Sequence, residues 1–227
     1  MPHIGKVVGI DKSEASIKKF NEQIDDERFT GLVLDIEAPD AETQLQKMKA
    51  DLGISGFDII YIALTLHHLS SQRSTLRMLR HHLNYGGICY ARSSDDGSKL
   101  AYPDPNNVMV DLINRTASPP IVSDRFHGRK LYGQLVSAGF ENVKTEAFTV
   151  DTASRTAGER YELFKSAFSW RKNYFKKMLD YASGDQIEKA VDDYTWASRA
   201  LDELEEMFYD PKFYCSFDTI ICIGEAR

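Results

Sequence analysis

The stretch Phe57-Asp-Ile-Ile-Tyr-Ile-Ala-Leu-Thr-Leu-His-His-Leu69 contains the most apolar run of the chain. A short continuous apolar run is typical of a buried parallel strand, and this one is far too short to span a bilayer. It predicts a strand over residues 57–66 that ends just before two histidines. Two shorter apolar runs precede it, at 7–10 and 29–34, and each is followed by an aspartate.

Helical segments alternate with these strands. A helix is predicted over residues 16–24, with Ser13 as its N-cap, and others over 41–52 and 71–83, before a strand at 88–92. This alternation predicts an α/β fold with a doubly wound, mostly parallel sheet and helices on both faces. Downstream we expect a long loop at 93–105, helices at 107–115 and 124–137 (capped by Ser123), and a strand at 143–150.

The composition changes in the last third of the chain. Apolar residues recur at helical spacing over 160–181 and 186–208, which predicts a helical hairpin, and a last strand follows at 217–224. We therefore predict one domain, residues 1–227, with a helical insertion or lid at 155–210. Arg171, Lys172, Lys176 and Lys177 are expected on a solvated helix face, and Trp170, Tyr174 and Trp196 in the helical core or in a lid.

Composition restricts the classes of function. The 227 residues carry a formal net charge of -6, so no global basic field would attract nucleic acid. The N-terminus lacks the apolar core of a signal peptide, which predicts a cytoplasmic protein without a membrane segment. The three cysteines lie in apolar runs and show no zinc spacing, so we expect buried thiols and no metal site.

Several local sequences, in this order, resemble class I S-adenosylmethionine-dependent methyltransferases. Lys6-Val-Val-Gly-Ile-Asp11 is similar to the second strand of that family, and residues 57–69 are similar to its fourth strand and following turn. Residues 79–90 resemble the glycine pair before strand five, 138–143 the entry to strand six, and 213–227 the antiparallel seventh strand. The resemblance implies a Rossmann-like methyltransferase sheet with an antiparallel last strand and a helical insertion before it.

The resemblance also implies a cofactor, S-adenosylmethionine, and a small-molecule methyl acceptor. An acid at the end of the second strand would accept the ribose hydroxyl hydrogens, and a carboxylate and a backbone N–H after the third strand would bind adenine. The backbone of the fourth strand would lie along the methionine part. The residues that match these positions are Asp11 and Lys12, Asp35 and Ile36, and Ala63 and Leu64.

Candidates for a catalytic base are His68 and Asp96, which follow the fourth and fifth strands. Each residue also has a possible structural role: local packing for His68 or its neighbour His67, and an Asp-Gly turn for Asp96. His127 could face the same pocket, whereas His81 and His82 are expected to be structural.

The glycine-rich loop and first strand of the family have no counterpart before Lys6. Without that central strand, the strands at 7–10 and 57–66 would pair directly, or another chain would fill the gap. We consider two explanations, a fragment of a longer enzyme and a natural short form. The predicted function is accordingly methyl transfer, impaired by this loss, and the alternative is a degenerate, non-catalytic binding or regulatory module, forming a homodimer through its sheet edges.

Overall fold

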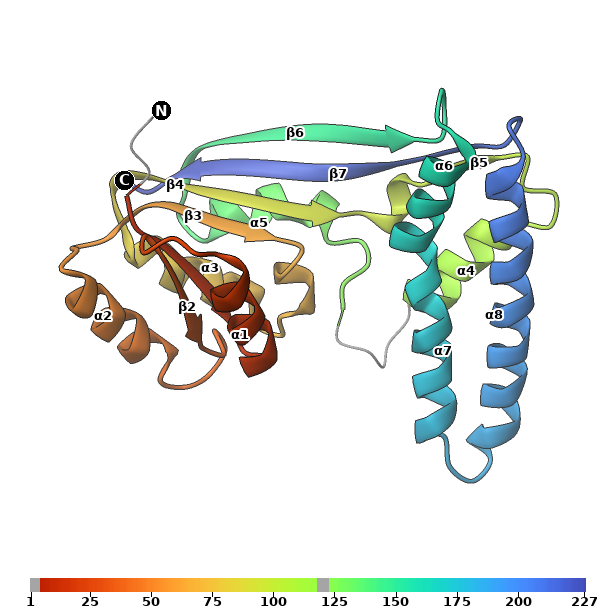
Figure 1. Ribbon diagram of the computed structural model, residues 1–227, viewed down its shortest axis with the longest axis horizontal. Helices are drawn as coiled ribbons and strands as arrows, with labels where there is room; N and C mark the ends of the chain where they lie inside the picture. Colours follow the sequence, from red (N-terminus) through yellow and green to blue (C-terminus); the bar gives the residue numbers. More distant parts are fainter. Residues whose placement is uncertain (1–4, 118–122) are drawn as a thin grey trace.

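The computed structural model describes residues 5–117 and 123–227, and strands and helices alternate through its first half (Figure 1). The predicted boundaries there hold to within a few residues, except that the strand predicted at 88–92 begins at Leu83. The elements are β1 (Val7–Asp11), α1 (Glu14–Gln23), β2 (Phe29–Val33), α2 (Ala41–Leu52), β3 (Phe57–Ala63), α3 (Gln72–His81) and β4 (Leu83–Ser94).

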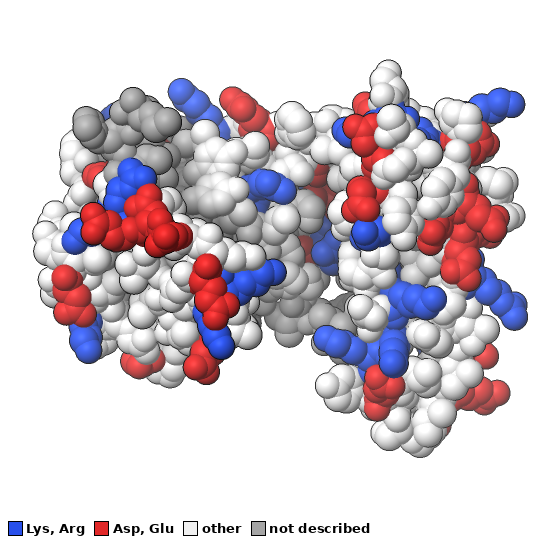
Figure 2. Space-filling model, viewed as in Figure 1, with Lys and Arg blue, Asp and Glu red and all other residues white. Residues whose placement is uncertain are grey.

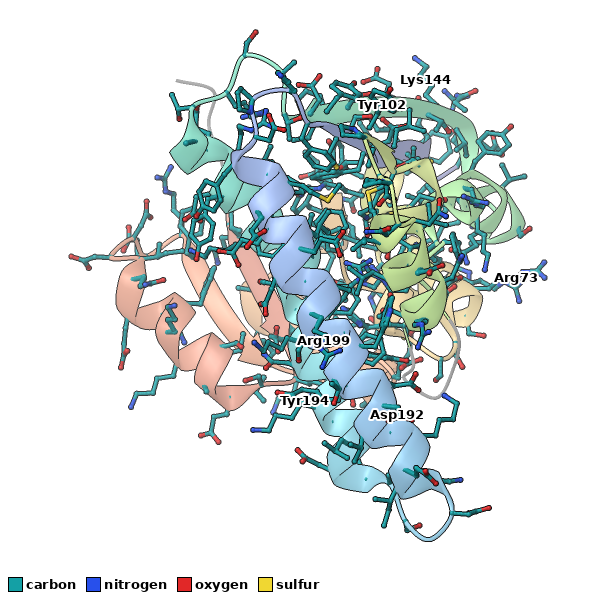
Figure 3. The ribbon with its side chains drawn as sticks, turned by 90° about the vertical axis from the view of Figure 1, so that its right-hand side faces the viewer. Arg73, Tyr102, Lys144, Asp192, Tyr194 and Arg199 are labelled. Atoms are coloured by element: carbon teal, nitrogen blue, oxygen red, sulfur yellow. The ribbon has the colours of Figure 1, made fainter. Side chains whose placement is uncertain are left out.

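The second half adds three strands that complete the sheet and a group of helices. The elements are β5 (Leu100–Tyr102), α4 (Val108–Ala117), α5 (Leu131–Ser137), β6 (Glu141–Asp151), α6 (Ala157–Phe164), α7 (Trp170–Tyr181), α8 (Gln186–Tyr209) and β7 (Tyr214–Glu225). A π-helical turn at Lys165–Ser169 joins α6 to α7. In Figure 3, α8 crosses in front of α7, with Asp192, Tyr194 and Arg199 along its length.

Two predicted segments were wrong. The loop expected at 93–105 contains the end of β4 and all of β5, because the long strand β7 pairs with both and overrides the local turn residues. The helix expected at 124–137 begins only at Leu131, preceded by a short 3-10 turn. Ser123 does not cap it, and its buried Oγ has no hydrogen-bond partner.

The strands form two sheets among residues 5–117 and 123–227. In one, β1 and β2 are parallel, with Asp11 opposite Val33. In the other, β3 is parallel to β4, and the antiparallel strand β7 lies between β4 and β6 (Figure 1). The predicted α/β class with an antiparallel last strand is therefore confirmed. The described residues do not pair β1 with β3, and a missing strand between them stays a prediction.

Among the described residues β3 is an edge strand that pairs on one side with β4, and one of its faces is exposed. Ile59 and Tyr61 on this strand are 64% and 61% exposed, whereas Ile62, which points to the other face, is 8% exposed. Only one face of β3 therefore packs into the core. That core, built from α2, α3, α5 and the sheet, includes Leu45, Leu76, Cys89 and Leu135.

The helices of the last third have a core of their own, which gathers residues of α4, α6, α7 and α8 around Phe168 and Phe208. Arg160 of α6 is buried there and donates hydrogen bonds to four main-chain carbonyls, those of Thr152, Phe208, Asp210 and Phe213. This side chain ties α6 to the end of α8 and to the strands β6 and β7. No helix in the described part of the chain is both long and apolar enough to cross a membrane.

Candidate functional site

The carboxyl end of β1 presents Asp11 to solvent. Its Oδ1 accepts a hydrogen bond from the Ser13 N–H at 2.7 Å, and Ser13 in turn caps α1 by accepting from the Ser16 N–H. The Oδ2 atom of Asp11 accepts no hydrogen bond from the described residues. Asp11 thus keeps one carboxylate oxygen available at the strand end, and the neighbouring Lys12 is exposed as well.

The end of β2 presents a second carboxylate in the same manner. Asp35 accepts from the Glu37 N–H through Oδ1 at 3.0 Å, which leaves its other oxygen without a described partner. The N–H of Ile36 also makes no hydrogen bond within the described ranges. A carboxylate oxygen beside a backbone N–H can bind an exocyclic amine and the ring nitrogen next to it.

Glu37 joins the end of β2 to the segment that follows β3. Its Oε1 accepts from the Ser70 hydroxyl at 2.9 Å and from the Ser71 N–H at 2.7 Å. Burial raises the pKa of Glu37, but these hydrogen bonds and the charge of Lys12 lower it overall, so the carboxylate is ionised. Although β2 and β3 belong to different sheets, this contact holds their carboxyl ends together.

The turn after β3 has an unusual backbone. Leu64 has a φ of 53°, in the left-handed region that branched side chains avoid, and its N–H donates to the Arg92 carbonyl at 2.9 Å. Thr65 closes the turn by donating from Oγ1 to the carbonyl of Ala63. Strained backbone of this kind is frequent at ligand sites.

The rings of the two histidines after this turn are in contact, with centroids 4.0 Å apart and planes tilted by 48°. His67 is 5% exposed, and its Nδ1 has no hydrogen-bond partner. Burial and the nearby His68 and Arg125 lower the pKa of His67 to about 3. Burial, Arg125 and Lys12 also lower the pKa of His68. Both rings are therefore neutral near pH 7, and His68 is the more accessible of the two.

A buried ionic cluster lies where β4 ends. The two oxygens of Asp96 accept from Nζ of Lys99, from Nε and Nη2 of Arg125, and from Nη2 of Arg171. Burial alone would raise the pKa of Asp96, but the charges of Arg171, Lys99 and Arg125 lower it to about 2. A carboxylate with so low a pKa is a weak proton acceptor, so the geometry favours an electrostatic role for Asp96 over a role as base.

The burial of Arg171 corrects the prediction of a solvated position. Its side chain is fully buried, and it donates to Asp96, to Thr116 and to the carbonyl of Ala167 in the π-helical turn. The sequence does carry a signal for this. Arg171 continues the spacing of Phe164, Phe168 and Phe175, which is the buried stripe of the helical insertion. No comparable pattern in the sequence marked Lys99 or Arg125 as buried.

Other predicted residues are packed into the surroundings of this cluster. Asp95 accepts a bidentate pair from Arg129 and caps the turn through the Gly97 N–H. His127 is fully buried between the Ser93 hydroxyl and the Gln134 amide oxygen, so it serves the packing beneath β4. Among the described residues, no group of histidines, cysteines and carboxylates could hold a metal ion.

These strand ends lie beside a hollow in the surface. In Figure 1 the arrowheads of β3 and β4 point towards α6 and α7, and Figure 2 shows a hollow between the α/β part and the helical hairpin. Lysine and arginine are interspersed with aspartate and glutamate over this visible face (Figure 2).

His67 predicts a pH dependence of stability. Its folded pKa of about 3 lies below its ordinary value of 6.5, so acid protonates the unfolded chain first. The stability it contributes is complete above pH 6.5 and declines as the pH falls towards 3. Between pH 7 and 4.5 we expect a loss of about 2–3 kcal/mol in the free energy of unfolding from this group.

The measurement is urea denaturation at both pH values for the wild type and for His67→Gln. The variant has no group that titrates here, so its loss over this interval should be smaller by about the same 2–3 kcal/mol. His81→Gln is the control, because His81 is exposed. Equal pH dependence in the wild type and His67→Gln would contradict the prediction.

Comparisons with known proteins agree with this geometry. Residues 2–89 match a methyltransferase domain family. Among solved structures, the YcgJ protein from Bacillus subtilis is similar with a TM-score of 0.52 and 15% identity, over 100% of this chain and 84% of that one. No curated protein matches the chain at the significance required.

Two further structures are more distant. A SAM-dependent methyltransferase from Archaeoglobus fulgidus has a TM-score of 0.43 and 16% identity, over 96% of this chain and 75% of that one. Coclaurine N-methyltransferase, bound to N-methylheliamine and S-adenosylhomocysteine, has a TM-score of 0.46 and 14% identity, over 96% of this chain and 60% of that one. The chain shares its α/β fold with the YcgJ protein. Residues 2–89 of the chain match a methyltransferase domain family, so the resemblance expected from the sequence is confirmed over this part of the chain.

Proposed function

We propose that the protein binds S-adenosylmethionine at the carboxyl ends of β1, β2 and β3 and transfers its methyl group to a small-molecule acceptor. The observation that carries the proposal is the Glu37 bridge, which holds the end of β2 against the segment after β3. Together with the parallel pairing of β1 and β2, it places two strand-end carboxylates and a strained turn at one edge. Ligands of α/β sheets bind in this position.

The described residues fit the adenosine end of the cofactor. Asp11 has a free oxygen for the ribose hydroxyls, and Asp35 with the Ile36 N–H suits the edge of adenine. Ala63 and Leu64 would lie along the methionine part of the cofactor. Within residues 5–117 and 123–227 no glycine-rich turn joins a strand to a helix at this edge, so these residues build no cradle for the methionine carboxylate.

The cofactor, when bound, supplies an electrophilic methyl group on a sulfonium. The protein's part is to position the acceptor nucleophile in line with that methyl group and to exclude water. His68, neutral and near the turn, remains our candidate for receiving the acceptor proton. The helical segment 155–210 would close over the acceptor, as predicted.

Replacing Asp11 with alanine should weaken binding of S-adenosylhomocysteine by at least about tenfold, because the ribose hydroxyls lose a charged acceptor. Isothermal titration of the folded protein measures this. Asp25→Ala is the matched control, since Asp25 is exposed beyond the far end of α1, about 15 Å along the helix axis. No binding by the wild type, or equal binding by Asp11→Ala, would contradict the proposal.

A second candidate is a non-catalytic methyltransferase-like binding module. The division of the described strands into two sheets, with the β3 edge exposed, favours it. An open strand edge can pair with a second copy, so this candidate predicts a homodimer. Sedimentation of the wild type, together with the same titration, separates the two: cofactor binding by a monomer supports the enzyme.

A further inference from the structure

The cluster around Asp96 contains more positive charge than it can neutralise. Asp96 accepts four hydrogen bonds on its two oxygens, which uses the full acceptor capacity of a carboxylate. Its single negative charge faces three cations, Lys99, Arg125 and Arg171, whose side chains are 4%, 13% and 0% exposed. Two positive charges are therefore left over in a largely buried place.

The nearby carboxylates do not supply the balance. Asp95 is held by Arg129 in a bidentate pair, and Asp124 is held by Lys130 at 2.6 Å. Each of these pairs is neutral in itself. The pKa values of the cluster agree with a surplus of positive charge. Burial lowers the pKa of Lys99 in spite of Asp96, and burial lowers that of Arg171 to about 10.

Arg125 is the member of the cluster that can reach a ligand. It is the most exposed of the three, and its guanidinium packs 4.4 Å from the ring of Trp170, which fixes its plane. Its Nε and Nη2 bind Asp96, whereas Nη1 makes no hydrogen bond to a described residue. His67, whose buried Nδ1 is unpartnered, lies next to this segment, since its carbonyl accepts from the N–H of Asp124 at 2.8 Å.

We propose that the methyl acceptor carries an oxyanion, a carboxylate or a phosphate, and that Arg125 binds it with the surplus charge of Lys99 and Arg171 behind it. An oxyanion offers the acceptor geometry that a guanidinium recognises, and a buried surplus of positive charge stabilises it. The location, at the ends of β3 and β4 beside the proposed methyl site, makes the acceptor the ligand. This assignment rests on the proposed function.

Isothermal titration with sodium phosphate and with sodium acetate at low ionic strength tests the site, with sodium chloride as the blank. The wild type should bind phosphate or acetate, and the better of the two indicates the class of acceptor. Arg125→Gln should weaken that binding by at least about tenfold. Arg115→Gln is the matched control, because Arg115 also packs on a tryptophan, Trp196 at 3.9 Å, and pairs with an aspartate, Asp193.

Arg125→Lys serves as a second variant if the glutamine variant does not fold, and it should weaken binding by a smaller factor because it keeps the charge. Absence of anion binding by the wild type would overturn the inference. Equal anion affinity of Arg125→Gln and Arg125→Lys would overturn it as well.

S-adenosylhomocysteine binding should be the same in the wild type and Arg125→Gln. If Arg125→Gln loses S-adenosylhomocysteine as well, the oxyanion is the carboxylate of the cofactor, and the assignment to the acceptor fails. If the wild type binds phosphate but not S-adenosylhomocysteine, the proposed function fails while the anion site stands.

Discussion

Asp96→Asn should lower the free energy of unfolding by about 3–5 kcal/mol, the range expected when one partner of a buried ionic network is removed. The substitution keeps the shape of the side chain. It removes the one negative charge that, among the described residues, Lys99, Arg125 and Arg171 share, and it places amide hydrogens against their N–H groups. Three buried cations then face one another without compensation. Urea denaturation at pH 7, followed by circular dichroism, measures the change.

Two other variants test whether the buried charge of Asp96 causes this loss of stability. Asp193→Asn also removes a carboxylate that pairs with two cations, Arg115 and Lys189, but this side chain is 25% exposed. Its loss should stay below about 1 kcal/mol, because water screens the pairs. Arg171→Met should cost less than Asp96→Asn, since it removes one of the surplus cations. If Asp96→Asn lowers the free energy of unfolding no more than Asp193→Asn does, the three cations do not depend on Asp96 in the way described.

The pH dependence of the same variant has a definite sign. The folded pKa of Asp96, about 2, lies below its ordinary value of 3.8, so the carboxylate stabilises the fold wherever it is ionised in the unfolded chain. The difference between wild type and Asp96→Asn should be constant from pH 7 down to about pH 4. It should shrink as the pH falls through 2, where the native carboxyl takes up its proton.

The sequence allowed the first half of the fold to be predicted because its signals are local. The runs that form β1, β2 and β3 are continuous in sequence, and each turn after them shows its aspartate or histidines at once. Asp11 and Asp35 were placed at strand ends for that reason. What could not be read from the sequence is the Glu37 bridge, since its partners Ser70 and Ser71 lie 33 and 34 residues further on.

The ionic cluster illustrates a different limit. Asp96 was expected near the site, but its partner Arg171 is 75 residues away, and a charged residue in a helix is ordinarily exposed. Only the stripe of phenylalanines around Arg171 marked that position as buried. Arg125 lies in a segment that was predicted to be helical and is instead held by side chains from β4 and its turn. Contacts between distant segments decided these positions, and local propensity did not.

Arg160→Met should lower the free energy of unfolding by at least about 3 kcal/mol, because hydrogen bonds from a charged donor are worth about 1.5–3 kcal/mol each and the acceptors remain buried. Methionine keeps the apolar stem but leaves the carbonyls of Thr152, Phe208, Asp210 and Phe213 without their donor. Arg155→Met is the control, since Arg155 donates to a single carbonyl, that of Asp151, from an exposed position.

Hydrogen exchange then shows which part of the molecule the arginine holds. The carbonyls that it binds belong to the end of α8 and to the segments that join it to β6 and β7, and α6 carries the side chain itself. Faster exchange in Arg160→Met should therefore be concentrated in α6, α7 and α8, and β3 and β4 should keep their protection because they pack in the other core. Arg160→Lys, with three donors on one nitrogen, should recover part of the loss. If exchange instead becomes faster to the same extent in both cores, the helical insertion does not open independently of the sheet. That result would contradict the lid that we assign to residues 155–210.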